Sequence, residues 1–219
     1  MLVGVVGFMG SGKGTVGDFL VEKHGFKKDS FAKALKDAAS AIFGWDREML
    51  EGDTPESRFQ REQRDRFWSE KLDIPDFTPR KALQLLGTEG GRHLFGEDLW
   101  IAGVEKRWID AGKPRTVITD CRFPNEVGII RNLGGVVWRV SRGEEPEWYQ
   151  DMLFYNKGLC DEEDIRKIRQ MVSVGSIPHE SETAWIGQDV DDIIYNDNTL
   201  EELEDKVSEL ITKLLPDES

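Results

Sequence analysis

Hydrophobic residues along this chain fall into short unbroken runs that alternate with stretches of helical spacing. The first run, "LVGVV", is rich in β-branched residues, ends at Gly7 and predicts a strand. Val16, Phe19 and Leu20 then recur at intervals of one to three residues, which indicates a helix that ends at Gly25. A strand, a glycine-rich loop and a helix therefore open the chain.

The same alternation continues through the rest of the sequence. It predicts further strands in "FKKDSF" (26–31), "TVIT" (116–119), "VVWRV" (136–140) and "DDIIY" (191–195). It predicts helices from Phe31 to Gly44, over the charged "RFQREQRDRFW" (58–68), from Thr78-Pro79, from Asp98, from Pro124 to Gly134, over 161–172 and from Thr199 through Leu214. The remainder of 142–190 is polar, and we expect it to be irregular.

Strands that are separated by helices predict an α/β fold with a parallel sheet and right-handed crossovers. We expect a three-layer fold: a five-stranded parallel sheet with helices on both faces, plus additional substrate-binding and lid helices. The predicted organisation is one domain over 1–219, with a core of 1–44, 113–141 and 189–219, an insert at about 45–112 and a lid at about 142–188. Ligands of such sheets bind beyond the carboxyl ends of the strands.

Composition and charge narrow the classes of function. The 219 residues are 38% hydrophobic, which suits a folded domain, and the net charge of -13 argues against sequence-independent binding to nucleic acid. The two cysteines, Cys121 and Cys160, are too few for a disulfide framework, and they lack the spacing of a metal site. The sequence shows no export signal or apolar run of membrane-spanning length, so we expect a cytoplasmic protein that contacts no membrane.

The most informative motif is "GFMGSGKGT", residues 7–15. Gly7, Gly12 and Lys13 satisfy the pattern G-x-x-x-x-G-K between a predicted strand and a predicted helix, which is the context of a P-loop. Glycines allow backbone N–H groups to face an anion, and the lysine reaches the β- and γ-phosphates. The alternative is a glycine-rich turn with a solvated lysine, and the flanking elements favour the P-loop.

One position departs from the common pattern and narrows the function. The residue after Lys13 is Gly14, and the hydroxyl expected on Mg²⁺ comes one place later, at Thr15. This form of the loop resembles that of adenylate kinase and other nucleoside monophosphate kinases. The predicted cofactors are therefore ATP and Mg²⁺.

A second candidate site follows the strand predicted at 116–119. Asp120 and Arg122 lie just past its carboxyl end, in the same crevice as the loop. They could instead be a surface ion pair, or Asp120 could cap the next helix. Pro124 at the first helical position makes Phe123 the N-cap residue and leaves Asp120 outside the helix, which favours a functional site.

Several longer segments then make a family recognisable. In order, "RKALQLLGTEGGRHLFGEDLW", "TDCRFPNEVGIIRNLGG", "VSRG", "HESE" and "DDIIYNDNTLEEL" resemble the bacteriophage deoxynucleoside monophosphate kinases, and with the P-loop the resemblance touches almost the whole chain. It implies transfer of phosphate from ATP to deoxynucleoside 5′-monophosphates for phage DNA precursor synthesis, in the host cytoplasm. It also implies that the 45–112 insert binds the monophosphate.

The resemblance assigns roles to individual residues. It implies catalytic roles for Lys13, Asp120, Arg122 and Arg142, with Arg142 over the phosphates and Thr15 on Mg²⁺. Asp120 is expected either to order a water on the metal or to bind the acceptor sugar. The predicted ATP-binding residues are Gly10, Ser11, Gly12, Lys13, Gly14, Thr15, Asn196 and Asn198; the predicted substrate-binding residues are Phe31, Lys33, Arg80, Gly87, Thr88, Trp100, Asp120, Arg122 and Glu126.

Some of these assignments have plain structural alternatives. The turn at Asn196, Asp197 and Asn198 could simply cap the last helix, and Trp100 could be an apolar-face residue. Ser181 and Glu182 are implied to help close the site. Arg142 is followed by Gly143 without the family's usual proline, and the lid is longer than expected over 143–178.

Three other functions fit parts of the sequence. A P-loop kinase for another small phosphorylated metabolite, similar to phosphomevalonate, would have the same loop and fold. A DNA-handling ATPase is disfavoured by the acidic charge, and a binding module without activity is disfavoured by the full set of predicted catalytic residues. The expected partners are a dNMP and ATP, with no direct nucleic-acid contact, and a homodimer is left open.

Overall fold

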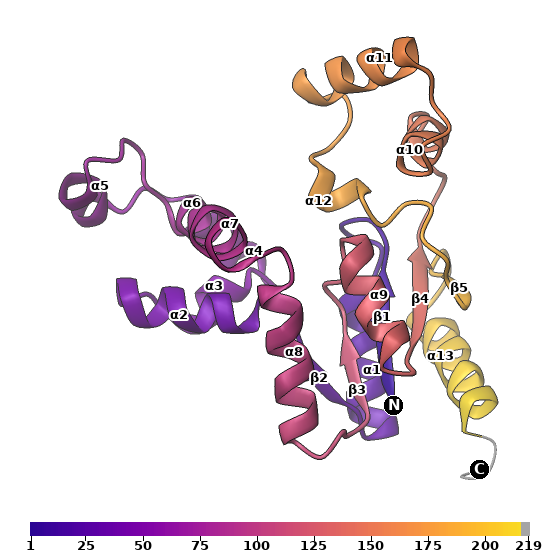
Figure 1. The fold of residues 1–219 in the computed structure, drawn as a ribbon. Coiled ribbons are helices and arrows are strands. Elements are labelled where there is room, and N and C mark those ends of the chain that lie inside the picture. Colours follow the sequence, from indigo (N-terminus) through magenta and orange to yellow (C-terminus); the bar gives the residue numbers. More distant parts are fainter. Residues whose placement is uncertain (216–219) are drawn as a thin grey trace. The chain divides into compact units, whose positions relative to one another are not determined.

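The computed structural model describes residues 1–215, which form two compact units (Figure 1). One unit is Met1–Ser30 together with the chain from Trp108 on, and the other is Phe31–Arg107. The second unit therefore starts at Phe31 and includes the helix that the sequence placed at the end of the 1–44 core. No helix among residues 1–215 has the length and apolar character needed to cross a membrane.

The first unit is built on a parallel sheet of five strands in the order β2-β3-β1-β4-β5. The strands are β1 (Leu2–Val6), β2 (Lys27–Asp29), β3 (Thr116–Ile118), β4 (Val136–Ser141) and β5 (Asp192–Tyr195). In the middle of the sheet, Val3 of β1 lies opposite Val117 of β3 and Val136 of β4. The fold predicted from the sequence, an α/β protein with a five-stranded parallel sheet, is confirmed.

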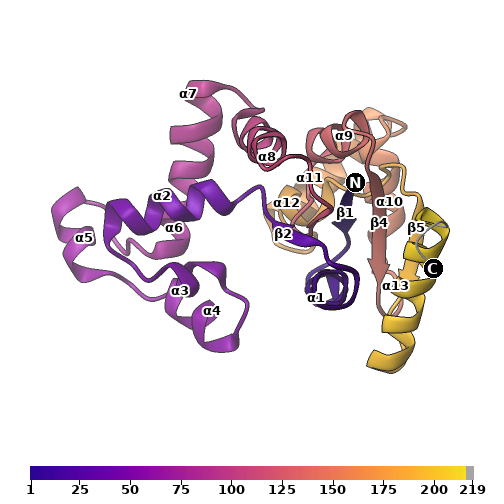
Figure 2. The same ribbon diagram turned by 90° about the horizontal axis from the view of Figure 1, so that it is seen from below.

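Helices cover both faces of this sheet. Figure 2 shows α9 (Pro124–Asn132) on one face and α1 (Lys13–His24) with α13 (Leu200–Leu214) on the other. The core between β1, β4, α1 and α13 is a cluster of buried hydrophobic side chains, and they include those that the hydrophobic pattern selects: Val3, Val5, Val16, Leu20, Trp138, Leu203, Val207, Leu210 and Ile211. Burial of each such side chain contributes about 1.5 to 3 kcal/mol.

The order of the strands reverses direction beside β1. After β1 the chain passes through α1 to β2 on one side of the sheet, whereas after the adjacent β4 it proceeds to β5 on the other side. The loops that follow β1 and β4 therefore diverge, and parallel sheets generally bind their ligands at such a point. The glycine loop lies at this point.

The 142–188 segment holds more helix than the sequence predicted. It contains α10 (Tyr149–Asn156), α11 (Glu162–Ser173) and α12 (Glu180–Thr183), whereas only α11 was expected. The start of α10 has no side-chain hydrogen bond at its N-cap, Trp148, so it lacks the usual sequence signal. The short α12 is capped by His179, whose ring accepts a hydrogen bond from Ser181 N.

The second unit is helical. Its elements are α2 (Lys33–Phe43), α3 (Arg47–Glu51), α4 (Pro55–Arg61), α5 (Arg66–Leu72), α6 (Pro79–Gln84), the π-helix η1 (Leu85–Arg92) and α7 (His93–Phe95). The helix α8 (Leu99–Asp110) continues into the first unit. Aromatic rings pack together within this unit, with Phe43 stacked on Trp45 at 4.5 Å and in contact with Trp68 and Phe77.

One predicted helix is wrong. The charged stretch at 58–68 is not continuous but splits between α4 and α5. The cause is Asp65, whose side chain accepts hydrogen bonds from Trp68 N at 3.0 Å and from Trp45 Nε1 at 2.8 Å, while its own N–H donates to Phe77 O. An aspartate that caps a helix ends the preceding one, and this tertiary contact with Trp45 leaves no periodic signal in the sequence.

Candidate active site

The glycine loop joins β1 to α1 and has a backbone that only glycine adopts easily. Gly7, Gly10 and Gly12 have φ values of 142°, 81° and 104°. A Cβ atom at Gly7 would lie 2.3 Å from Val140 O, and one at Gly12 would lie 2.4 Å from Asn196 Nδ2. Gly7 is therefore required by its contact with backbone as well as by conformation, and Gly12 is required by its conformation.

The loop leads directly into the first turn of α1. Gly12 is the N-cap residue, so no side chain bonds to the N–H groups of this turn, and the turn carries no acidic residue. These N–H groups and the positive end of the helix dipole make a binding site for an anion. Thr15 lies half-buried in the same turn, and Ser11 is buried with a hydroxyl that has no protein partner among residues 1–215.

Lys13 folds back over the loop. Its Nζ donates hydrogen bonds to Gly7 O and Phe8 O, both at 2.7 Å. Burial lowers the pKa of Lys13 to about 8, an effect that the charge of Glu182 opposes and the charge of Arg122 reinforces. The ammonium group is therefore charged at neutral pH and held where the loop would place a phosphate.

Asn196 braces the loop from the end of β5. Its Nδ2 donates to Ser11 O at 2.8 Å, and its backbone N donates to Ser141 O at the end of β4. Asn198 donates through Nδ2 to the side chain of Glu202 in the first turn of α13, whereas the N-cap residue of that helix is Thr199, whose hydroxyl accepts from Glu202 N. Asp197 accepts a hydrogen bond from Gly143 N at 2.6 Å and so ties this turn to the loop after β4.

Asp120 and Arg122 follow β3, as predicted. Asp120 accepts a hydrogen bond from Ser30 Oγ at 2.8 Å. The exposed side chain of Arg122 forms an ion pair with Glu182 in α12, with Nη1 and Oε1 2.5 Å apart, and the same Nη1 lies 3.4 Å from Ser181 O. The guanidinium group of Arg122 thus contacts two residues that lie 59 and 60 positions further along the chain.

Glu126, another of the residues predicted to bind substrate, is buried at the start of α9. This carboxylate is only 3% exposed, and its Oε2 accepts hydrogen bonds from Arg122 N at 2.7 Å and from Phe123 N at 3.1 Å. Phe123 is the N-cap residue of α9, as Pro124 predicted. Glu126 therefore fixes the backbone that carries Arg122. Arg142 is exposed just past the end of β4.

The other predicted substrate-binding residues lie in the Phe31–Arg107 unit. Phe31 is buried, Lys33 pairs with Asp37 at 2.6 Å, and Arg80 pairs with Glu62 at 2.9 Å. Trp100 is more than an apolar-face residue, because its Nε1 donates to Gly87 O in the π-helix at 2.9 Å. Thr88, the next residue, is exposed.

Sequence reasoning missed a cluster of aromatic side chains at the base of the 142–188 segment. We define the aromatic cluster as Phe8, Trp148, Tyr149 and Trp185. Phe8 packs edge-on against the other three rings at centroid distances of 5.6, 6.1 and 5.0 Å respectively. The sequence signal that could have indicated this cluster was Phe8, an aromatic residue at a variable position of the P-loop pattern.

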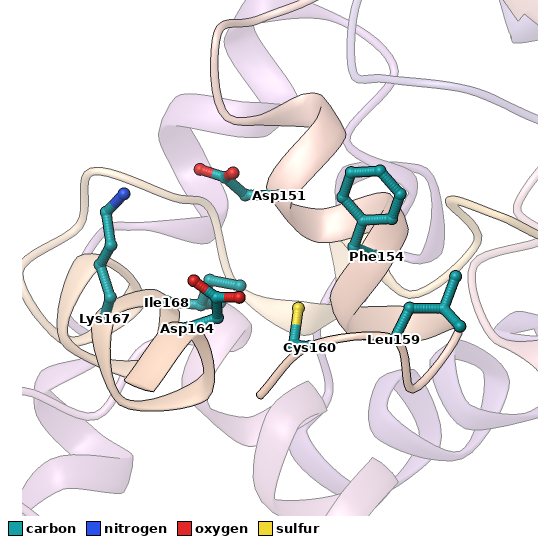
Figure 3. Close-up of a pocket in the computed structure, with 7 residues that line it drawn as sticks. All are labelled: Asp151, Phe154, Leu159, Cys160, Asp164, Lys167 and Ile168. Carbon is teal, nitrogen blue, oxygen red and sulfur yellow. The ribbon is translucent and has the colours of Figure 1, made fainter. Parts of the chain in front are cut away.

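A pocket elsewhere in the 142–188 segment lies between α10 and α11 (Figure 3). The side chains that line it combine two carboxylates, an ammonium group, a thiol and three apolar groups: Asp151, Phe154, Leu159, Cys160, Asp164, Lys167 and Ile168. None of them belongs to the predicted site. The pocket is therefore separate from the glycine loop and the end of β3.

The fold and the site together define a class of protein. A parallel sheet with a phosphate-binding loop after β1, and acidic and basic side chains after the neighbouring β3, is the arrangement of a P-loop kinase. The chain is 32% identical over 155 residues to a protein of Acanthamoeba polyphaga mimivirus provisionally named a deoxynucleotide monophosphate kinase, a match that covers 65% of this chain and 74% of the mimivirus protein. This chain belongs to the deoxynucleoside monophosphate kinase family.

Other similarities are shorter or more distant. Over 54 residues the chain is 46% identical to the deoxynucleoside-5′-monophosphate kinase of Escherichia phage T5. This match covers 25% of this chain and 22% of the phage protein. Dephospho-CoA kinase from Campylobacter jejuni is 15% identical with a TM-score of 0.47, covering 97% of this chain and 96% of that one. Shikimate kinase from Aquifex aeolicus is 12% identical with a TM-score of 0.43, covering 99% of each chain. No protein-family model matches the sequence.

Proposed function

We propose that this protein transfers the γ-phosphoryl group of ATP to a deoxynucleoside 5′-monophosphate. A phosphate oxygen of the monophosphate attacks the γ-phosphorus, the bond from that phosphorus to the β–γ bridging oxygen breaks, and dNDP and ADP are released. The observation that carries the proposal is the loop with Lys13 folded over it, in a chain that belongs to a family named for this reaction.

The donor site is the glycine loop and the first turn of α1. The N–H groups of this turn have no side-chain cap, and they bind the β- and γ-phosphates of ATP. Lys13 moves its three N–H donors from Gly7 O and Phe8 O to the phosphate oxygens, where its charge stabilises the transferred group. The hydroxyl of Ser11, buried without a partner among the described residues, is a further donor at this place.

The acceptor site is the end of β3. Arg122 binds the phosphate of the monophosphate in place of Glu182, and Arg142 covers the transferred group. The acceptor oxygen is already anionic at neutral pH, so the reaction needs positioning and charge stabilisation rather than a strong base.

The residues also fit a magnesium ion. Mg²⁺ prefers oxygen ligands, keeps several waters and is held through one or two protein groups together with substrate phosphates. The hydroxyl of Thr15 and the carboxylate of Asp120 are such groups. When bound, the ion would neutralise charge on the β- and γ-phosphates.

The test is coupled ADP release measured with every common dNMP and NMP as acceptor. We expect dNMP-dependent release that falls by about two orders of magnitude or more in Lys13→Ala, because the principal phosphate cation is lost. Lys23→Ala is the matched control, since this lysine of α1 pairs with Glu204 on the surface, away from the glycine loop. Near wild-type activity in Lys13→Ala, or ADP release stimulated by DNA and not by dNMPs, would contradict the proposal.

A further inference from the structure

Phe8 is the second residue of the glycine loop, and phosphate binding does not explain it. The pattern G-x-x-x-x-G-K places no demand on this side chain, because the loop binds phosphate through backbone N–H groups. Phe8 is nevertheless half-buried, whereas the next residue, Met9, is 72% exposed. Phosphate binding does not require a large apolar side chain at residue 8, so the burial of the Phe8 ring has another cause.

The ring of Phe8 joins both ends of the 142–188 segment. Trp148 and Tyr149 come from the start of α10, and Trp185 follows α12, and all three pack edge-on against Phe8. Edge-to-face contacts of this kind contribute beyond the burial of apolar area. Side chains near both ends of the segment therefore contact one residue of the loop.

A charged residue of β4 strengthens this contact. The guanidinium group of Arg139 lies 5.0 Å from the ring of Tyr149 and 5.1 Å from the ring of Trp185. It also donates to the Tyr149 hydroxyl at 2.9 Å and pairs with Glu145. Because Arg139 lies on a central strand, the aromatic cluster is anchored to the sheet as well as to the loop.

The backbone of Phe8 contacts the group that binds phosphate. Its carbonyl oxygen accepts hydrogen bonds from Lys13 Nζ at 2.7 Å and from Ser11 N at 3.2 Å. The same cluster extends to the acceptor side, because Trp185 Nε1 donates to the carbonyl of Glu182, the residue that pairs with Arg122. Phe8 thus connects the 142–188 segment to Lys13 through its side chain and its carbonyl.

We propose that Phe8 is a positioning residue that couples the 142–188 segment to the phosphate-binding loop. Packing of its ring in the aromatic cluster sets the position of its carbonyl and so the position of Lys13. By reciprocity, ATP that draws Lys13 away from this carbonyl changes the stability of the aromatic cluster. The inference rests on the proposed use of the loop for ATP, but not on the identity of the acceptor.

The test compares Phe8→Ala with wild type in two measurements. The first is the affinity for a non-hydrolysable ATP analogue, which we expect to fall about tenfold in Phe8→Ala because the loop loses its support. The second is hydrogen exchange in the peptides that contain Trp148, Tyr149 and Trp185. We expect the analogue to change exchange there in the wild-type protein and to have no effect in Phe8→Ala.

The controls separate coupling from a loss of structure. Val174→Ala changes an exposed side chain of the 142–188 segment outside the aromatic cluster and should behave as wild type. Phe8→Tyr keeps the ring and should restore both signals, and Phe8→Leu keeps apolar volume if the alanine variant does not fold. A double-mutant cycle with Trp148→Leu should show non-additive effects on analogue affinity, because the two rings are in contact.

The outcomes are distinct. If the Phe8 variants bind the analogue as wild type does, or if the analogue changes exchange in the 142–188 segment equally in all variants, the coupling role is overturned. If the wild-type protein shows the coupled response but releases no ADP with any dNMP, the coupling stands and the proposed acceptor is wrong. If the wild-type protein binds no ATP analogue, both proposals are overturned.

Discussion

The lowered pKa of Lys13 leads to a prediction about the pH dependence of ATP use. In the free protein burial brings this pKa to about 8, so the ammonium group is charged below that pH and neutral above it. A neutral amine cannot neutralise phosphate, so kcat/KM for ATP should fall as the pH rises. With a pKa of about 8, the charged fraction drops about tenfold between roughly pH 7 and pH 9, and kcat/KM should drop by the same factor.

The assay is coupled ADP release at a saturating dNMP concentration, with ATP varied at each pH. The profile of kcat/KM reports groups of the free protein, whereas that of kcat reports the bound complex. Bound phosphates raise the pKa of Lys13 by their negative charge, so kcat should stay constant to a higher pH. Lys13→Arg, which remains charged throughout, should lose the decline in kcat/KM near pH 8 whatever its absolute activity.

Glu182 offers a second check on the same reasoning. Its carboxylate opposes the effect of burial and raises the pKa of Lys13. Glu182→Gln removes this charge, so the decline in kcat/KM should begin at a lower pH than in the wild-type protein. Glu180→Gln, in the same short helix, is the control and should leave the midpoint unchanged. A wild-type profile that is flat up to about pH 10 would refute the assignment of a buried, perturbed Lys13.

Two further predictions concern conformation and stability. Gly12→Ala should abolish ATP binding, because alanine would be strained at a φ of 104° and its Cβ would lie 2.4 Å from Asn196 Nδ2. Gly128→Ala in α9 is the control and should bind ATP normally, because nothing lies within 4 Å of the added Cβ. Titration with an ATP analogue compares the two variants. Asp65→Ala should lower the unfolding free energy by about 2 kcal/mol, because the N-cap of α5 and the bond from Trp45 are both lost. Urea denaturation checks the second prediction, and an unchanged midpoint would show that these bonds contribute little.

Much of the first unit could be predicted from the sequence, because its signals are local. The β-branched run before Gly7, the helical spacing after Lys13 and the proline at residue 124 each specify a strand or a helix within a few residues. A parallel sheet then follows from the alternation of strands and helices. The glycine loop could also be predicted from the sequence, since the G-x-x-x-x-G-K pattern describes a loop conformation within nine consecutive residues.

Other features were decided by contacts between distant segments. The break at Asp65 depends on Trp45 and Phe77, and the perturbed pKa of Lys13 depends on burial and on Glu182. No pattern within a window of residues carries this information, because hydrogen bonds and charges act across space. The helices at 149–156 and 180–183 were missed for a related reason: one has no cap signal, and the other is a single turn.

The sequence by itself determined the class of the protein, its sheet and the residues of the glycine loop, because those properties reside in short contiguous motifs. Only the tertiary structure decided what those residues contact. It shows Asn196 bracing Ser11, Glu126 holding the backbone of Arg122, and Phe8 packed against both ends of the 142–188 segment. Such roles depend on contacts between side chains that are far apart in the sequence, and spacing along the sequence does not give the distance between them in space.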